Sequence, residues 1–130
     1  MPSPRLTFVA LSVSDLPASR RFYRDVVGIP LHDASHDAHL DDPWYGGEHA
    51  ACTWTDGAFM HFALYPARLP ERPVSTGAQI GFHVDRFDEV YDRVVTEGVH
   101  VVQTPRDEPW GRTARFLDPD GNIVSITRNR

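Results

Sequence analysis

The sequence contains a single cysteine and no long apolar run. Cys52 has no partner within the chain for a disulfide, so a reducing compartment is the natural setting. No segment approaches the ~18 consecutive apolar residues that a membrane span needs. The first residues, Met-Pro-Ser-Pro-Arg, contain no apolar signal core. We therefore expect a cytoplasmic protein that does not cross a membrane.

Positive charge is also scarce. Acidic residues number 18 against 13 basic ones, which gives a formal net charge of −5. This balance argues against nucleic acid or an anionic membrane as partner, and it is compatible with a cationic ligand. The sequence has no glycine-rich phosphate loop, nucleophile elbow or CxxC pair. Reactions that depend on these motifs therefore have no support.

What the sequence does contain is a repeat of about half its length. The pattern of residues 8–15 returns in residues 79–86, and the Asp-Asp-Pro-Trp of residues 41–44 returns as the Asp-Glu-Pro-Trp of residues 107–110. The Asp-Gly corner at residues 56–57 returns within residues 118–121. Such a duplication predicts two copies of one supersecondary unit.

Each copy has the pattern of a βαβββ unit. An alternating strand comes first, then a helix with Ser14 or Asp15 as its cap and Gly28 at its end; Asp85 and Gly98 take these places in the second copy. Short strands are expected at 29–31 and 99–103, followed by polar loops and a hairpin at each Asp-Gly corner. The loop 32–42 should be exposed and mobile.

The predicted fold class is α+β. Two βαβββ modules, residues 5–66 and 77–128, joined by a proline-rich linker, would form one domain over residues 1–130. Their strands would form a curved, cup-shaped mixed sheet with the helices on its outer face. Period-two alternation then predicts the residues that line the cup: Phe8, Ala10, Ser12, Phe59, His61, Ala63, Gln79, Gly81, His83, Ile123, Ser125 and Thr127.

Several of these segments resemble a known family. They are Val13-Ser-Asp-Leu16 before a helix with Arg21-Phe-Tyr-Arg24, and Trp110-Gly111 followed by Phe116-Leu-Asp-Pro-Asp-Gly-Asn122. Together they resemble the vicinal oxygen chelate superfamily, which includes glyoxalase I, extradiol dioxygenases, and fosfomycin and bleomycin resistance proteins. The resemblance covers essentially the whole chain. It implies a homodimer with grooves shared between two subunits.

The same resemblance indicates where a metal would be held. Metal-dependent members place His at the start of the first strand of a copy and Glu in the strand after each Asp-Gly turn. Phe8, His61, Gln79 and Ser125 occupy those positions here. Only His61 is a good donor, and one imidazole does not hold a divalent ion against water. We expect no metal and no cofactor, although a non-standard site of His49, His61 and His83 remains open from sequence alone.

Aromatic residues are expected to frame the cup, where they could stack on a flat ligand. The complete set of expected ligand-binding residues is Phe8, Trp44, Trp54, Phe59, His61, Gln79, His83, Trp110, Arg112, Phe116 and Ser125. The tryptophans could instead close the core or a dimer interface. Arg112 and Arg115 flank the last hairpin, where they could anchor a carboxylate or phosphate, although surface ion pairs are their more ordinary role. Cys52 has the ordinary pattern of a buried packing residue.

Three functions remain open at this point. The first is a metal-independent protein that binds a small aromatic or cationic compound. The second is a lyase, isomerase or dioxygenase with a rearranged metal site, or one that uses His61 as general base. The third is a structural or partner-regulated module whose cup has no ligand.

Overall fold

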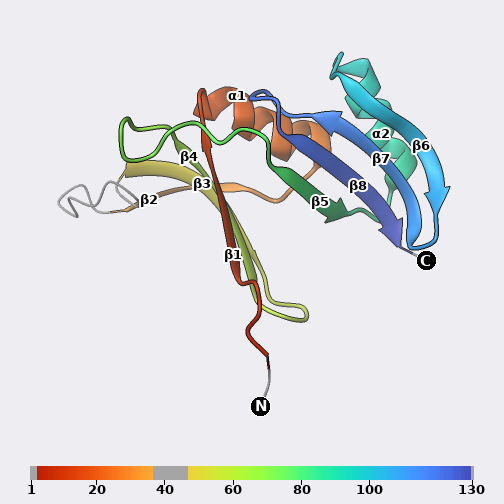
Figure 1. Ribbon diagram of the computed structural model, residues 1–130, viewed down its shortest axis with the longest axis horizontal. Helices are drawn as coiled ribbons and strands as arrows, with labels where there is room; N and C mark the ends of the chain where they lie inside the picture. The colour runs from red at the N-terminus through yellow and green to blue at the C-terminus, as the bar shows by residue number, and fades with distance from the viewer. Residues whose placement is uncertain (1–2, 37–46, 130) are drawn as a thin grey trace.

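The computed structural model describes residues 3–36 and 47–129 (Figure 1). They form two four-stranded sheets and two helical segments. The elements in chain order are β1 (Phe8–Val13), α1 (Leu16–Arg20) with its wider-turned continuation η1 (Arg21–Val27), β2 (His32–His36), β3 (Gly47–Trp54), β4 (Met60–Pro66), β5 (Gln79–His83), α2 (Phe87–Thr96), β6 (Val101–Glu108), β7 (Gly111–Leu117) and β8 (Ile123–Asn129).

The two sheets have the same topology. Their strand orders are β1-β4-β3-β2 and β5-β8-β7-β6. In each sheet the first pair is parallel and the other pairs are antiparallel. The prediction of an α+β fold with two βαβββ modules is confirmed. Within the described ranges, no helix has the length and apolar character that crossing a bilayer needs.

The first helix begins and ends as the sequence predicts. The Asp15 carboxylate accepts a hydrogen bond from the Ala18 N–H at 3.1 Å, which satisfies one of the free donors of the first turn. Gly28 ends η1 with φ of 96°, a left-handed conformation that favours glycine. Asp85 does not cap α2, which is a correction: its carboxylate instead accepts from His83 Nε2 at 2.9 Å.

The second strand of each copy differs from the prediction. The chain at 29–31 is not a strand, and β2 occupies residues 32–36, which were expected to begin a loop. In the second copy, β6 extends through the expected polar loop as far as Glu108. Both segments are polar because each forms the far edge of its sheet, where one side stays in water. The rest of the predicted 32–42 loop lies outside the described residues.

One apolar core lies between the helices and the covered faces of both sheets. Phe22 packs edge-on against Phe116 of the second sheet at 5.9 Å, and Tyr23 packs in the same way against Phe62 of the first sheet at 5.5 Å. The buried Tyr23 hydroxyl donates to Asp118 at 2.7 Å, which joins the first helix to the last hairpin. The first helix therefore stabilises both halves of the molecule.

The two sheets diverge from this core. In Figure 1, β1 and the β3–β4 hairpin extend away from α1, while β5 and β8 run in another direction. The segment between the sheets is fixed to the end of β1, because Ser12 N–H donates to Ser75 Oγ at 2.9 Å and Ser75 N–H donates to the Ser12 carbonyl at 2.8 Å. In each sheet, one face packs against the core and the helices, and the other face is open.

Candidate functional site

The open face of the first sheet has an apolar floor. Ala63 of β4 pairs with Ala10 of β1 and Ala51 of β3, and Tyr65 lies two residues along β4 on the same face. Ala51, Ala63 and Tyr65 are buried together in a cluster separate from the main core. Ala51 and Ala63 are only 3% and 0% exposed, so this cluster is covered within the chain, where His49 stacks on the Tyr65 ring and the Arg72 guanidinium lies 4.9 Å from its centre.

His61 lies at the end of this floor. Its ring stacks on Phe8 with centroids 5.4 Å apart, and its Nδ1 lies 2.7 Å from Thr53 Oγ1. All three residues are neighbours in the sheet, because Phe8 and Thr53 both pair with His61. Among the described residues, no hydrogen bond uses Nε2, so this nitrogen is available to a ligand or to move a proton. Thr53 was not predicted, although the hairpin geometry could have indicated it.

The three histidines left open by the sequence do not converge. His49 stacks on Tyr65 at 4.6 Å, four residues along β3 from Thr53 and so about 13 Å from the His61 position. His83 lies in the other sheet and is bonded to Asp85 through Nε2 and to the Asn129 N–H through Nδ1. Within residues 3–36 and 47–129, no three His, Cys, Asp or Glu side chains group as a metal site would require.

The open face of the second sheet is polar. Gln79 and Gly81 of β5 face β8, where Gly81 pairs with Ser125 and His83 with Thr127. Ser125 is four residues past its Asp-Gly corner, as His61 is, yet Ser125 pairs with Gly81 while His61 pairs with Phe8. The register of the parallel pair β5–β8 therefore differs by two residues from that of β1–β4.

Other expected ligand-binding residues lie elsewhere. Phe116 is completely buried on the covered face of β7, against Phe22. Arg112 also points to that side, where its guanidinium lies 5.8 Å from the centre of the Phe87 ring and forms an ion pair with Asp107 at 3.3 Å. Neither residue lines the open face, because successive side chains of β7 point to opposite faces and both lie on the covered one.

The aromatic frame is only partly formed. Trp54 packs beside the main core, while Phe59 and Trp110 are each 54% exposed at turns. Trp44 lies outside the described residues. On the same face of the first sheet as His61, Phe8 pairs with His61 and Tyr65 lies four residues further along β4; Tyr65 was not predicted.

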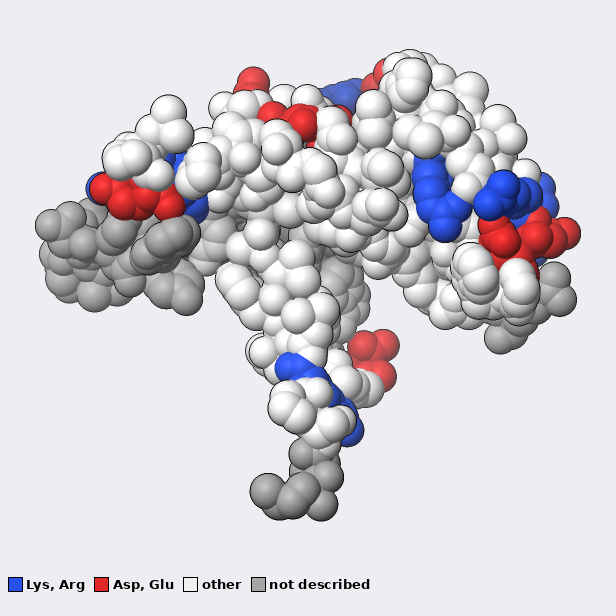
Figure 2. Space-filling view, in the orientation of Figure 1, with Lys and Arg blue, Asp and Glu red and all other residues white. Residues whose placement is uncertain are grey.

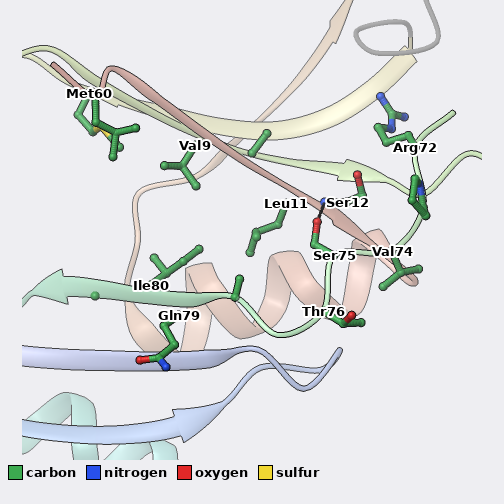
Figure 3. Close-up of a pocket in the computed structure, with 15 residues that line it drawn as sticks. Val9, Leu11, Ser12, Met60, Arg72, Val74, Ser75, Thr76, Gln79 and Ile80 are labelled. Atoms are coloured by element: carbon green, nitrogen blue, oxygen red, sulfur yellow. Dashed lines mark hydrogen bonds between the residues drawn. The ribbon is translucent and has the colours of Figure 1, made fainter. Parts of the chain in front are cut away.

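Two cavities border the line where the sheets diverge. One, of about 820 Å³, lies between β1 and β5, and Figure 3 shows Val9 and Leu11 facing Ile80 across it, with Met60 towards one end and Arg72 towards the other. The second, of about 770 Å³, is lined by residues of the first hairpin, β5 and α2. The middle of the molecule is almost free of charged side chains in the view of Figure 2, and charges gather towards its ends.

Two buried groups are unsuited to reaction. Burial raises the pKa of the Cys52 thiol to about 11, so it is protonated at neutral pH and a poor nucleophile. Burial, with the adjacent Asp118 carboxylate, also raises the pKa of Tyr23 well above its ordinary value. Both residues therefore have structural roles.

Comparison with known proteins is consistent with this geometry. Residues 5–126 match the model of the Glyoxalase/Bleomycin resistance protein/Dioxygenase superfamily. The Bacillus subtilis protein YetH is 27% identical over 118 residues, which cover 91% of this chain and 92% of that protein.

Solved structures of the same fold include an antibiotic binding protein. TnmS3, an antibiotic binding protein from Streptomyces sp. CB03234, has a TM-score of 0.68 and 26% identity, covering 100% of this chain and 99% of that one. A glyoxalase/dioxygenase from Nostoc punctiforme has a TM-score of 0.69 and 25% identity, covering 97% and 91%. The chain belongs to the Glyoxalase/Bleomycin resistance protein/Dioxygenase superfamily.

Proposed function

We propose that this protein binds a small aromatic or cationic compound in the cup bordered by its open sheet faces, without a metal ion. The observation that carries this proposal is the donor set at the positions where metal-dependent relatives are expected to hold an ion. Phe8, Gln79 and Ser125 supply no anionic ligand, and His61 is already bonded to Thr53. One imidazole with neutral neighbours is a weak site for a divalent ion and a suitable one for an organic ligand.

The exposed rings at one end of the first sheet support an aromatic ligand. Phe8 is 41% exposed and stacks on His61, and Phe59 near the same end is 54% exposed, so a flat molecule can stack there. Stacking on such rings contributes roughly 1 kcal/mol beyond the burial of area. The antibiotic-binding protein TnmS3, with which the chain shares its fold at 26% identity, gives independent support for a binding role.

The test combines metal analysis with ligand titration. Freshly purified protein should contain far less than one equivalent of Mn, Fe, Ni or Zn, and its tryptophan fluorescence should be quenched saturably by some members of a panel of planar aromatic compounds. His61→Ala should weaken that binding, while His100→Ala, at an exposed position, should not. A stoichiometric metal ion whose removal abolishes turnover would contradict the proposal.

A second candidate is a metal-free enzyme that uses His61 as general base. The favouring observation is the hydrogen bond between Nδ1 and Thr53, which orients the ring and leaves Nε2 available. If His61→Ala eliminated turnover of a substrate while leaving the unfolding transition unchanged, this alternative would replace the hypothesis that the protein only binds its ligand.

We also propose that the protein works as a homodimer. Leu6, Phe8 and Phe59 lie around the projecting end of the first sheet and are 71%, 41% and 54% exposed, respectively. A second copy that covers this apolar surface would also complete the cup. Light scattering should give twice the chain mass of 14.7 kDa, and a monomer at all concentrations would contradict this.

The buried free thiol of Cys52 fits the reducing cytoplasm, where we place the protein.

A further inference from the structure

The open face of the second sheet contains an arginine, Arg115, that has no acidic partner among residues 3–36 and 47–129. Among the described residues, Arg20, Arg21, Arg24, Arg86, Arg106 and Arg112 each pair with an Asp or Glu. Arg115 is half-buried, and its one side-chain hydrogen bond is donated by Nη1 to Gln103 Oε1. A half-buried guanidinium without a carboxylate is unusual in a chain of net charge −5.

Arg115 belongs to a row of residues across four strands. Gln103 of β6 pairs with Arg115, Arg115 pairs with Ser125 of β8, and Ser125 pairs with Gly81 of β5. Directly opposed residues in neighbouring strands share a face, with side chains about 5 Å apart at their bases. The Arg115 guanidinium and the Ser125 hydroxyl can therefore reach one small group.

Gly81 keeps the end of this row open. A Cβ atom at this position would lie 2.7 Å from Ser125 Oγ, closer than real Cβ contacts occur. The absent side chain leaves the Ser125 hydroxyl accessible from above the sheet, between the side chains of Gln79 and His83, which flank Gly81 on the same face.

The chemistry of the row is that of an oxyanion site. Arg115 keeps N–H donors beyond the one used by Gln103, and its planar fork matches the two oxygens of a carboxylate. Ser125 adds a hydroxyl donor, and Gln79 can add an amide donor. Gln103 holds the guanidinium in place. No carboxylate of the described chain lies in this row to compete for the site.

We propose that Arg115 and Ser125 form an oxyanion subsite, so that the ligand carries a carboxylate or similar group in addition to its aromatic part. This inference rests on the proposed binding function and narrows its ligand class to aromatic acids. The acid group would bind at the Gly81–Ser125–Arg115 row, and the aromatic part would extend from there into the cup.

The experiment compares 2-naphthoate with 2-naphthamide, which have the same ring and differ in charge. Binding to the wild-type chain is measured by NMR titration. The acid should bind about tenfold or more tightly than the amide, because one hydrogen-bonded charge pair is removed in the amide. Arg115→Gln should bring the ratio close to one, and Arg115→Lys should keep part of it.

Arg128→Gln is the matched control. It removes the same charge from an exposed position that pairs with Arg112 rather than lying in the row, so the acid-to-amide ratio should not change. Urea unfolding of Arg115→Gln shows whether the variant is folded. Gly81→Ala supplies a second test, since the added methyl group should reduce acid binding while leaving the guanidinium in place.

The outcomes separate this inference from the proposed function. If uncharged or cationic aromatics bind but the acid has no advantage over the amide, the subsite is overturned and the binding function stands. An acid preference that survives Arg115→Gln also overturns the subsite. If no panel compound binds at all, both proposals fail.

Discussion

The two open sheet faces share one strand topology and have opposite chemistry. In the first sheet, alanines line the middle of the face and the exposed Phe8 ring stacks on His61 at one end. In the second sheet, the equivalent surface presents Gln79, Ser125 and Arg115. The duplicated fold supplies the framework, and the residues at alternate strand positions determine what each copy can bind.

The covered faces differ from the open ones in another respect. Their residues from both sheets meet in one core through Phe22 and Tyr23 of the first helix. Substitutions on the covered faces should therefore change stability, whereas substitutions on the open faces should change binding.

The largest expected effect is on the covered face of the second sheet. Phe116→Ala should lower the free energy of unfolding by about 3–5 kcal/mol, because it leaves a cavity against Phe22 in a completely buried site. Trp110→Ala, at a 54% exposed turn position, should change it by only about 0.5 kcal/mol. Urea unfolding followed by circular dichroism measures both. Equal effects would mean that Trp110 is buried by a partner.

A smaller loss is expected where the two halves are joined by a hydrogen bond. Tyr23→Phe removes the donor at 2.7 Å from the buried Asp118 carboxylate and should lower the free energy of unfolding by about 1–3 kcal/mol. The Asn122 side chain still donates to that carboxylate at 3.1 Å, which limits the loss. Tyr91→Phe is the control, with no expected change. An unaltered unfolding midpoint for Tyr23→Phe would show that this link contributes nothing.

The two open faces can be separated by one pair of substitutions. His61→Ala should weaken 2-naphthoate and 2-naphthamide by the same factor, roughly tenfold, because it removes a ring and a hydrogen-bonding group from the aromatic side. Arg115→Gln should weaken only the acid. The double variant should show additive losses in NMR titration, since the residues contact different parts of the ligand. An acid-selective effect of His61→Ala would break the distinction between the faces.

The smallest effect is on the reactivity of the thiol beneath the first open face. With its pKa raised by burial to about 11 from 9.0, Cys52 has about a hundredfold less thiolate at pH 8 in the folded chain. Iodoacetamide should therefore label native protein far more slowly than unfolded protein, as mass spectrometry can show. Because the unfolded thiol loses its proton first, stability should also fall as pH rises from about 9 to 11. Equal labelling rates would place Cys52 at the surface.

Much of the fold could be predicted because its signals are local. The repeat indicated two modules, Asp15 and Gly28 marked the ends of the first helix, and alternation placed Phe8 and Gln79 on open faces. Asp85 was wrong as a cap because its side chain bonds to His83 instead. An Asp just before a helix has the same sequence pattern whether it caps the helix or bonds to another side chain.

The candidate site was predicted less well because the register of a strand decides which of its side chains lie on the open face. Phe116 and Arg112 were placed in the cup, yet both lie on the covered side of β7, while Arg115 lies on the open side. A shift of one residue exchanges the two faces of a strand. Composition and aromatic content give no information about that shift.

The sequence by itself determined the duplicated βαβββ units, the turns at the Asp-Gly corners and the ends of the first helix, since each depends on residues a few positions apart. Only the tertiary structure decided which residues meet across the parallel pairs β1–β4 and β5–β8. Parallel strands are joined by long crossovers, so no local pattern fixes their register. That register places His61 beside Phe8 and Ser125 beside Gly81, and with them the chemistry of the two faces.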